Sequence, residues 1–244
     1  MTTSATSPKL RPQFYWRGLH VPFITPWTHE NWLRTPVVRR IGHGGEGLGY
    51  ADEHSTADRR HGDLWIRYSI APGRGQPSLA GVHPLRQRQA MSHMLCQVCG
   101  MSTYEDESFE RWGERHLFIR RSRDGQPITE GEVTMTPPVC LPCAQESVRN
   151  CPHLRKGYAA ALVRYSQRWG IGGLLYDRTT LRPDLTAVTD EPGAESVDDQ
   201  KAGLVMARFT NPRTRWMLAA RQAETLHGVT PIKLEDIANY MPAA

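Results

Sequence analysis

Apolar and polar residues alternate in several stretches of the chain, which is the pattern of a half-buried strand. In residues 63–70, DLWIRYSI, the side chains of Leu64, Ile66 and Tyr68 fall on one face of an extended chain. The same alternation predicts a strand in residues 161–169, which residues 171–176 continue or pair with. Residues 203–210, GLVMARFT, are predicted to form another strand. The pattern therefore indicates a substantial β content.

Two stretches favour helices. The first is opened by His83-Pro84, because proline is well tolerated at the first helical position, and it leads into Met91, Met94 and Leu95. The second begins at Asn211-Pro212, where an N-cap residue precedes proline, and it is closed by a glycine. Its apolar residues recur at helical spacing: Trp216, Ala219, Ala220, Ala223 and Leu226, ending at Gly228. We expect this second helix to be the most regular one.

Glycine and proline divide the remaining chain. Pro22 and Pro26 exclude a long helix in residues 14–27, so short strands or extended segments are expected there. Residues 42–63 are rich in Gly, His and Asp and are predicted to form a loop. The segments 115–121 and 131–136 are predicted to form a hairpin, because Ser-Arg-Asp-Gly between them is typical of a turn.

These elements indicate one irregular α+β domain over residues 13–244, with small sheets and a few helices around a metal module. Residues 1–12 are expected to be a flexible tail and residues 183–201 an exposed acidic loop. No stretch is apolar enough for a secretory signal or a membrane span, so the expected location is the cytoplasm, with no membrane partner.

The 244-residue chain has a formal net charge of +5, and the first 95 residues hold the surplus, with 12 basic against 6 acidic residues. Such a surplus is a weak indication of nucleic-acid binding. Only 4 of the 30 basic residues are lysine, a bias that fits a GC-rich genome.

The five cysteines carry the clearest chemical signal. Cys96-Gln-Val-Cys99-Gly has the form of a zinc knuckle, in which the glycine relieves the tight turn. The second pair, Cys140 and Cys143, precedes a helical stretch. Zinc prefers four tetrahedral thiolate or imidazole ligands, and in a reducing cytoplasm paired CxxC units favour a metal over a disulfide. The spacing therefore predicts a four-cysteine structural zinc site.

Cys151 is left over from this site. If residues 143–150 are helical, Cys151 lies about 12 Å along the axis from Cys143 and does not reach the same ion. We expect it to be a small buried residue at the helix end. The alternative is that a broken helix lets Cys151 and His153 form half of a second site or replace one thiolate.

The order of knuckle, hairpin and CxxC at a helix start resembles the treble-clef zinc finger over residues 95–151. The motifs HPLRQRQAM, LCQVCG, PPVCLPCAQES and CPHLR, together with LGYADE and the TPW segment, are also similar to a group of uncharacterised actinobacterial zinc-finger proteins. This second resemblance implies no activity.

The alternative interpretation of the histidines and carboxylates is that they form a catalytic site. A treble clef also carries HNH nucleases, but the only hairpin histidine, His116, has no acidic or histidine neighbour, and Asn150 and His153 are poorly spaced for a catalytic ion. A hydrolase site could instead be built from the loop side chains. These are Asp52, Glu53, His54, Asp58, His61 and Asp63, none of them spaced as in HExxH.

For nucleic acid, the candidate contacts are arginines beside the zinc module: Arg86, Arg88, Arg120, Arg121 and Arg123. For a protein partner, the tryptophans of the N-terminal third offer an aromatic surface, although a place in the core explains most of them. We expect a zinc-stabilised binding or accessory protein that recognises a protein or a nucleic acid and is not catalytic.

Overall fold

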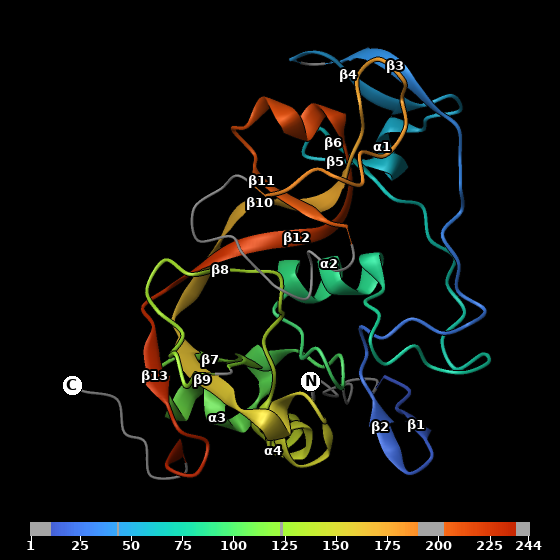
Figure 1. The fold of residues 1–244 in the computed structure, drawn as a ribbon. Coiled ribbons are helices and arrows are strands. Elements are labelled where there is room, and N and C mark those ends of the chain that lie inside the picture. Colours follow the sequence, from blue (N-terminus) through green and yellow to red (C-terminus); the bar gives the residue numbers. More distant parts are fainter. Residues whose placement is uncertain (1–10, 43, 123, 190–202, 238–244) are drawn as a thin grey trace, which may run out of the picture.

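The computed structural model of the chain describes residues 11–42, 44–122, 124–189 and 203–237. It is a mixed α+β structure of small sheets and short helices, as the sequence predicts. The strands form one large sheet, a three-stranded sheet and two separate two-stranded hairpins. In Figure 1 the large sheet crosses the centre, the smaller sheet lies below it and the hairpins lie at the periphery. The α-helices are α1 (Ser55–Asp58), α2 (Pro84–Ser92), α3 (Glu107–Arg111) and α4 (Leu141–Asn150). Short 3-10 turns are η1 (Thr103–Glu105), η2 (Leu154–Lys156) and η3 (Pro212–Trp216).

The largest sheet has the strand order β11–β10–β12–β6–β5, and β8 also pairs with β12. Its strands are β5 (Arg59–Arg60), β6 (Asp63–Trp65), β8 (Val133–Thr134), β10 (Tyr165–Leu175), β11 (Val205–Arg208) and β12 (Met217–His227). Helix α2 lies against this sheet (Figure 1). The buried amide of Gln87 fixes α2 there: it donates to the Gln222 carbonyl at 2.9 Å and accepts from the Gln222 N–H at 3.0 Å.

The predicted helix after Asn211 is wrong. The Asn211 side chain does cap the Arg213 N–H, but the helical segment ends with the single 3-10 turn η3, and residues 217–227 form β12. Strand β10 pairs with β12 on one side, and β6 and β8 pair with it on the other, so hydrogen bonds to neighbouring strands replace those of a helix. Ala219 and Ala223 are fully buried in this strand. Pairing along the sheet overrides the helix propensity of alanine, which is a weak preference.

The second sheet has the order β13–β9–β7, with β7 (His116–Arg121), β9 (Tyr158–Val163) and β13 (Thr230–Ile232) antiparallel to their neighbours. Its two faces bury alternate residues. Leu117 and Leu162 face a cluster that contains Cys96 and Cys143, whereas Phe118 packs with Met94 and Leu226 on the other side. This sheet therefore joins the cysteine module to the end of β12.

The predicted hairpin between residues 115–121 and 131–136 is wrong, because β7 pairs with β9 and β8 pairs with β12. Strand β7 is apolar on both faces, so it needs a partner that is apolar on both faces as well. The sequence of β9, YAAALV, meets this need, and GEVTMT does not. An ion pair of 2.6 Å between Arg120 and Glu132 still links the two segments.

The loop predicted over residues 42–63 is wrong for most of its length. Residues Gly45–Tyr50 form β4, which pairs with β3 (Val37–Gly42), and α1 and β5 follow. Leu48 and Tyr50 are buried, and a Cβ atom at Gly47 would lie 2.7 Å from the Arg215 carbonyl oxygen. The glycine therefore allows a close backbone approach within a strand and does not mark a loop.

The other predicted segments are the N-terminal strands, the strand over residues 63–70, the tail and the acidic loop. The short strands β1 (Phe14–Trp16) and β2 (Leu19–Val21) form a hairpin before Pro22, as expected. The strand predicted over residues 63–70 is shorter, since β6 ends at Trp65, although Tyr68 forms an isolated bridge with Trp32. Residues 1–10 of the predicted tail and 190–201 of the predicted acidic loop lie outside the described residues. None of the helices in the described ranges is long and apolar enough to cross a membrane.

Candidate metal centre

The first CxxC pair lies in a knuckle stabilised by backbone hydrogen bonds. The Cys96 N–H donates to the Met101 carbonyl at 2.8 Å, and the Gly100 N–H donates back to the Cys96 carbonyl at 2.8 Å. Gly100 has a φ of +71°, a region that side-chain-bearing residues rarely adopt. The turn thus requires the glycine of the motif, as its sequence predicts.

The second pair lies at the start of α4. Cys140 is the N-cap residue, and Cys143 lies in the first turn of the helix, after Pro142. The Ala144 N–H donates to the Cys140 carbonyl at 2.9 Å and closes that turn. The partial positive charge of a helix N-terminus favours thiolates at these positions.

The fold brings the two pairs together. The sulfur atoms of Cys96, Cys99, Cys140 and Cys143 all lie within 4.8 Å of one another, and this group could hold a metal ion. The Sγ atoms of Cys99 and Cys140 are 3.9 Å apart. Among the residues that the structure describes, these four form the only such group of three or more His, Cys, Asp or Glu side chains.

The four thiols influence one another's ionisation. Hydrogen bonds from Cys140, Cys143 and Cys96 hold the pKa of the Cys99 thiol far below its ordinary value. Hydrogen bonds to Cys140, Cys96 and Cys99 raise the pKa of Cys143 far above its ordinary value. The group by itself therefore shares protons between its sulfurs, and a bound cation would stabilise all four as thiolates.

Apolar packing surrounds the four sulfurs. Cys96 and Cys143 are buried in a cluster with Trp112, Leu117 and Leu162. The knuckle is also tied to the segment before α4, since the Gln97 N–H donates to the Pro138 carbonyl at 2.9 Å. The cysteines thus lie where the second sheet, α4 and the knuckle meet, so a metal ion bound there would couple the packing of all three.

Cys151 is not part of the sulfur group. It caps the C-terminus of α4, where its N–H donates to the Ser147 carbonyl at 2.8 Å. The helix over residues 143–150 is present as predicted, and it keeps Cys151 at the opposite end from Cys140. Cys151 is half-buried, so it is more exposed than expected.

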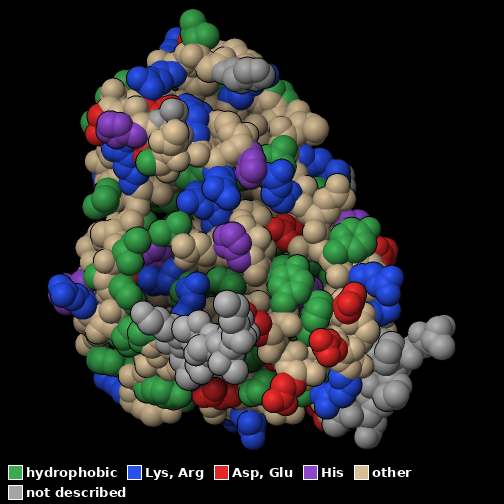
Figure 2. Space-filling view, turned by 180° about the vertical axis from the view of Figure 1, so that it is seen from behind, with side chains coloured by type: hydrophobic (Ala, Val, Ile, Leu, Met, Phe, Trp, Pro, Cys, Tyr) green, Lys and Arg blue, Asp and Glu red, His purple; other side chains and the backbone are tan. Residues whose placement is uncertain are grey.

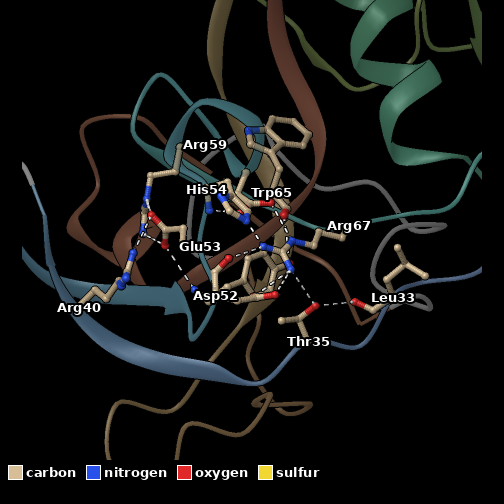
Figure 3. Close-up of polar contacts among 11 residues, drawn as sticks. Leu33, Thr35, Arg40, Asp52, Glu53, His54, Arg59, Trp65 and Arg67 are labelled. Atoms are coloured by element: carbon tan, nitrogen blue, oxygen red, sulfur yellow. Dashed lines mark hydrogen bonds and ion pairs between the residues drawn. The ribbon is translucent and has the colours of Figure 1, made fainter.

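The acidic side chains of residues 52–58 are engaged by arginines (Figure 3). Arg59 donates two hydrogen bonds to Glu53, at 2.7 and 2.9 Å, and Arg40 lies 3.6 Å from the same carboxylate. Burial would raise the pKa of Glu53, but the hydrogen bonds from Arg59 outweigh it and lower the pKa. This carboxylate is committed to an ion-pair network.

Arg67 occupies the other two carboxylates in the same way. It donates to both oxygens of Asp58, at 2.8 and 2.7 Å, and to both oxygens of Asp52, at 2.9 and 3.1 Å (Figure 3). These hydrogen bonds hold the pKa of Asp58 below its ordinary value. Three of the six candidate hydrolase side chains, Asp52, Glu53 and Asp58, thus belong to an arginine–carboxylate network that joins β4, α1 and the segment after β6.

The arginines singled out for nucleic-acid contact have other roles. Arg86 is buried and donates to both oxygens of Glu30, so it offers no exposed surface to a phosphate. Arg88 is half-buried, with its guanidinium 4.3 Å from the centre of the Trp65 ring. Arg120 is paired with Glu132, Arg121 is half-buried, and Arg123 lies outside the described residues. Of the four that the structure describes, Arg86 and Arg120 are thus paired with carboxylates, and Arg88 packs on an aromatic ring.

His116 is buried on β7. Its Nδ1 atom lies 2.8 Å from the Thr103 hydroxyl, and burial lowers its pKa to about 4. The ring packs between Tyr104 and Phe109. A general base of a nuclease needs an accessible ring, and only 2% of the surface of His116 is exposed.

Comparison of the chain with protein-family models, with curated proteins and with solved structures finds no match in any of the three. The resemblance to the actinobacterial group therefore rests on the sequence motifs alone.

Proposed function

We propose that the four-cysteine group binds one zinc ion. An ion about 2.3 Å from four tetrahedral thiolates places the sulfurs ~3.8 Å apart, close to the 3.9 Å between Cys99 and Cys140. Four thiolates in this arrangement suit zinc or an iron–sulfur cluster, and an array small enough for a single ion favours zinc. The knuckle and the helix start correspond to two parts of a treble clef, whereas the predicted hairpin between them does not form.

The function that the site supports best is that of a zinc-stabilised binding protein which recognises a macromolecular partner and is not an enzyme. One observation carries this proposal: all four ligands come from the protein, and they lie in the core cluster around Trp112 and Leu117. Structural zinc sites are closed in this way, whereas catalytic ones keep a position for water or substrate. Zinc here would supply folding free energy.

The enzymatic alternatives receive less support from the geometry. Of the carboxylates proposed for a hydrolase on residues 52–63, those of Asp52, Glu53 and Asp58 are each paired with an arginine, which leaves Asp63 alone outside these ion pairs. An HNH-like nuclease needs an accessible histidine, and His116 is buried.

Cobalt substitution tests whether the centre is closed. We expect a tetrahedral tetrathiolate spectrum that does not change when imidazole or azide is added, because no coordination position is open. The loaded protein should also leave plasmid DNA and model esters intact with added Mg²⁺ or Mn²⁺. A shift of the visible bands with the added ligand, or metal-dependent turnover, would contradict the proposal.

A further inference from the structure

A cleft of about 710 Å³ lies apart from the cysteine group, between the large sheet and the module that carries β7. The start of β10 and the second half of β12 form one wall. The other wall comes from η1, α3 and β7. Figure 2 shows arginine or lysine and histidine side chains gathered across the middle of the face opposite to that of Figure 1. A concavity of this size is typical of ligand sites, and neither the zinc centre nor the network around Arg67 uses it.

Three arginines line this cleft: Arg60, Arg164 and Arg168. All three are exposed, and none of them forms an ion pair with a carboxylate within the described ranges. The neighbouring Arg59 shows the contrast, because it donates two hydrogen bonds to Glu53. The cleft thus concentrates arginines that form no ion pair with a described carboxylate, whereas the arginines of the Glu53 and Asp58 network are neutralised.

The acidic residues of the lining do not cancel this charge. They are Glu114 and Glu224, and Glu224 is buried, with only 3% of its surface exposed. Its carboxylate accepts hydrogen bonds from the Gln222 amide, at 2.6 Å, and from the Ser166 hydroxyl. Burial also raises the pKa of Glu224, which favours its neutral form. Glu114 is therefore the one exposed carboxylate in the lining, against three exposed arginines, and of these Arg168 also interacts with the carboxylates of Glu224 and Asp63.

Two tyrosines in the same lining are unusually exposed. Tyr104 and Tyr165 are 55% and 54% exposed, and each ring also contacts another ring of the protein. The ring of Tyr165 stacks on His227, with the centres 5.0 Å apart, and Tyr104 meets His116 edge-on at 4.6 Å. Supported aromatic rings of this kind are platforms on which a flat ligand can stack.

Exposed arginines that form no ion pair, together with exposed tyrosines, favour a ligand that is both anionic and aromatic. Arginine guanidinium groups form bidentate hydrogen bonds to phosphates, and nucleobases stack on tyrosine rings. Base faces are accessible only where bases are unpaired, so a single strand fits this combination and a duplex does not. An acidic peptide would use the arginines but leave the tyrosines without a planar partner.

We propose that this cleft binds single-stranded nucleic acid, with Arg60, Arg164 and Arg168 contacting phosphates and Tyr104 and Tyr165 stacking on bases. The inference rests on the proposed binding function and names the class of its partner. The cleft is thereby a different candidate surface from the arginines beside the cysteine motifs, of which Arg86 is buried.

Fluorescence anisotropy with a labelled oligonucleotide of about twelve nucleotides tests the proposal, since one binding domain covers ~4–16 nucleotides. The zinc-loaded full chain should bind the single strand more tightly than the matching duplex, with an affinity that falls as salt rises. The triple variant Arg60→Gln, Arg164→Gln, Arg168→Gln should reduce the slope of log affinity against log salt by about 2, at ~0.7 per lost phosphate contact. Tyr104→Ala and Tyr165→Ala should each weaken binding by about five- to a hundredfold.

The matched control is the triple variant Arg17→Gln, Arg74→Gln, Arg149→Gln, which removes the same charge from exposed arginines outside the cleft. It should keep most of the salt slope. If both triple variants lost the same amount of salt slope, the cleft would not be the binding surface and the proposal would fail. Tighter binding to duplex than to single strand, or tighter binding to a polyglutamate peptide, would also overturn it. If no oligonucleotide binds, the nucleic-acid inference fails. The binding function itself fails separately, through turnover or an open cobalt centre.

Discussion

The guanidinium of Arg86 donates hydrogen bonds of 2.7 and 2.6 Å to the two carboxylate oxygens of Glu30, and both side chains are buried. The same carboxylate accepts from the N–H groups of Trp27 and Ala71, at 2.8 and 2.9 Å, and Arg86 also donates to the Thr25 carbonyl. This pair therefore joins α2 to two segments that have little regular structure of their own.

Glu30→Gln should destabilise the protein by about 3–5 kcal/mol, because it leaves the Arg86 charge buried without its counter-ion. Urea unfolding followed by circular dichroism measures this. The double variant Glu30→Met, Arg86→Met should lose less than Glu30→Gln, since no buried charge remains. As a control, Glu46→Gln breaks the exposed pair with Arg39, at 4.0 Å, and should cost less than about 1 kcal/mol. A cost for Glu30→Gln as small as that of the control would show that the pair adds little to stability.

His116 should make stability fall in mild acid. Burial lowers its folded pKa to about 4, below the value of ~6.5 expected in the unfolded chain. Between these two pH values the unfolded state binds more protons than the folded state. The contribution of neutral His116 to the free energy of unfolding is therefore fully present above pH ~6.5 and is lost as the pH falls toward 4. The full loss is about 3 kcal/mol.

Unfolding free energies measured between pH 7 and pH 4 check this dependence. His116→Asn should flatten the slope in that window while keeping a polar atom near the Thr103 hydroxyl. An unchanged slope in the variant would assign the acid sensitivity to other groups.

The middle of β10 should not tolerate side chains. A Cβ atom at Gly170 would lie 2.0 Å from the Ala207 carbonyl oxygen of β11, next to a register shift between β10 and β12. Gly170→Ala should therefore lower stability by about 1–3 kcal/mol through overpacking, read as a lower melting temperature in calorimetry. Gly42→Ala in β3 is the matched control, because nothing lies within 4 Å of its Cβ position. Equal melting temperatures for the two variants would be inconsistent with the packing between β10 and β11.

Local signals were predictable from the sequence. His83 caps α2 with Pro84 at its first position, Gly100 takes the positive φ of the knuckle, and Cys140 precedes a helix that runs to Asn150. Each feature depends on residues only a few positions apart. The two CxxC pairs also converge as expected, because their shared chemistry makes a long-range contact recognisable from sequence.

Contacts set by the sheet were not predictable in the same way. The alanines and leucines of residues 217–227 have helical spacing, but the pairing of β12 with β10, over most of its length, decides its conformation. Likewise, the carboxylates of Asp52 and Glu53 read as a polar loop until the fold places Arg67 and Arg59 beside them. Arg60, Arg164 and Arg168 lie about a hundred residues apart at the extremes, and only the fold brings them to one cleft.

Loss of a sulfur from the group should unfold the module. A structural zinc site contributes its binding energy to folding, which is about 10–16 kcal/mol in zinc-finger peptides. Cys143→Ser should therefore aggregate or melt far below the native protein. Cys151→Ser alters a half-buried helix cap whose backbone hydrogen bond to Ser147 is kept, so it should melt only modestly lower.

Zinc content per chain in Cys143→Ser and Cys151→Ser, measured by elemental analysis beside the native protein, tests the central claim most directly. The two cysteines lie at opposite ends of α4, and only Cys143 belongs to the sulfur group. We predict one zinc per chain in the native protein and in Cys151→Ser, and none in Cys143→Ser. Full zinc retention in Cys143→Ser, or release from Cys151→Ser, would contradict a closed centre of Cys96, Cys99, Cys140 and Cys143.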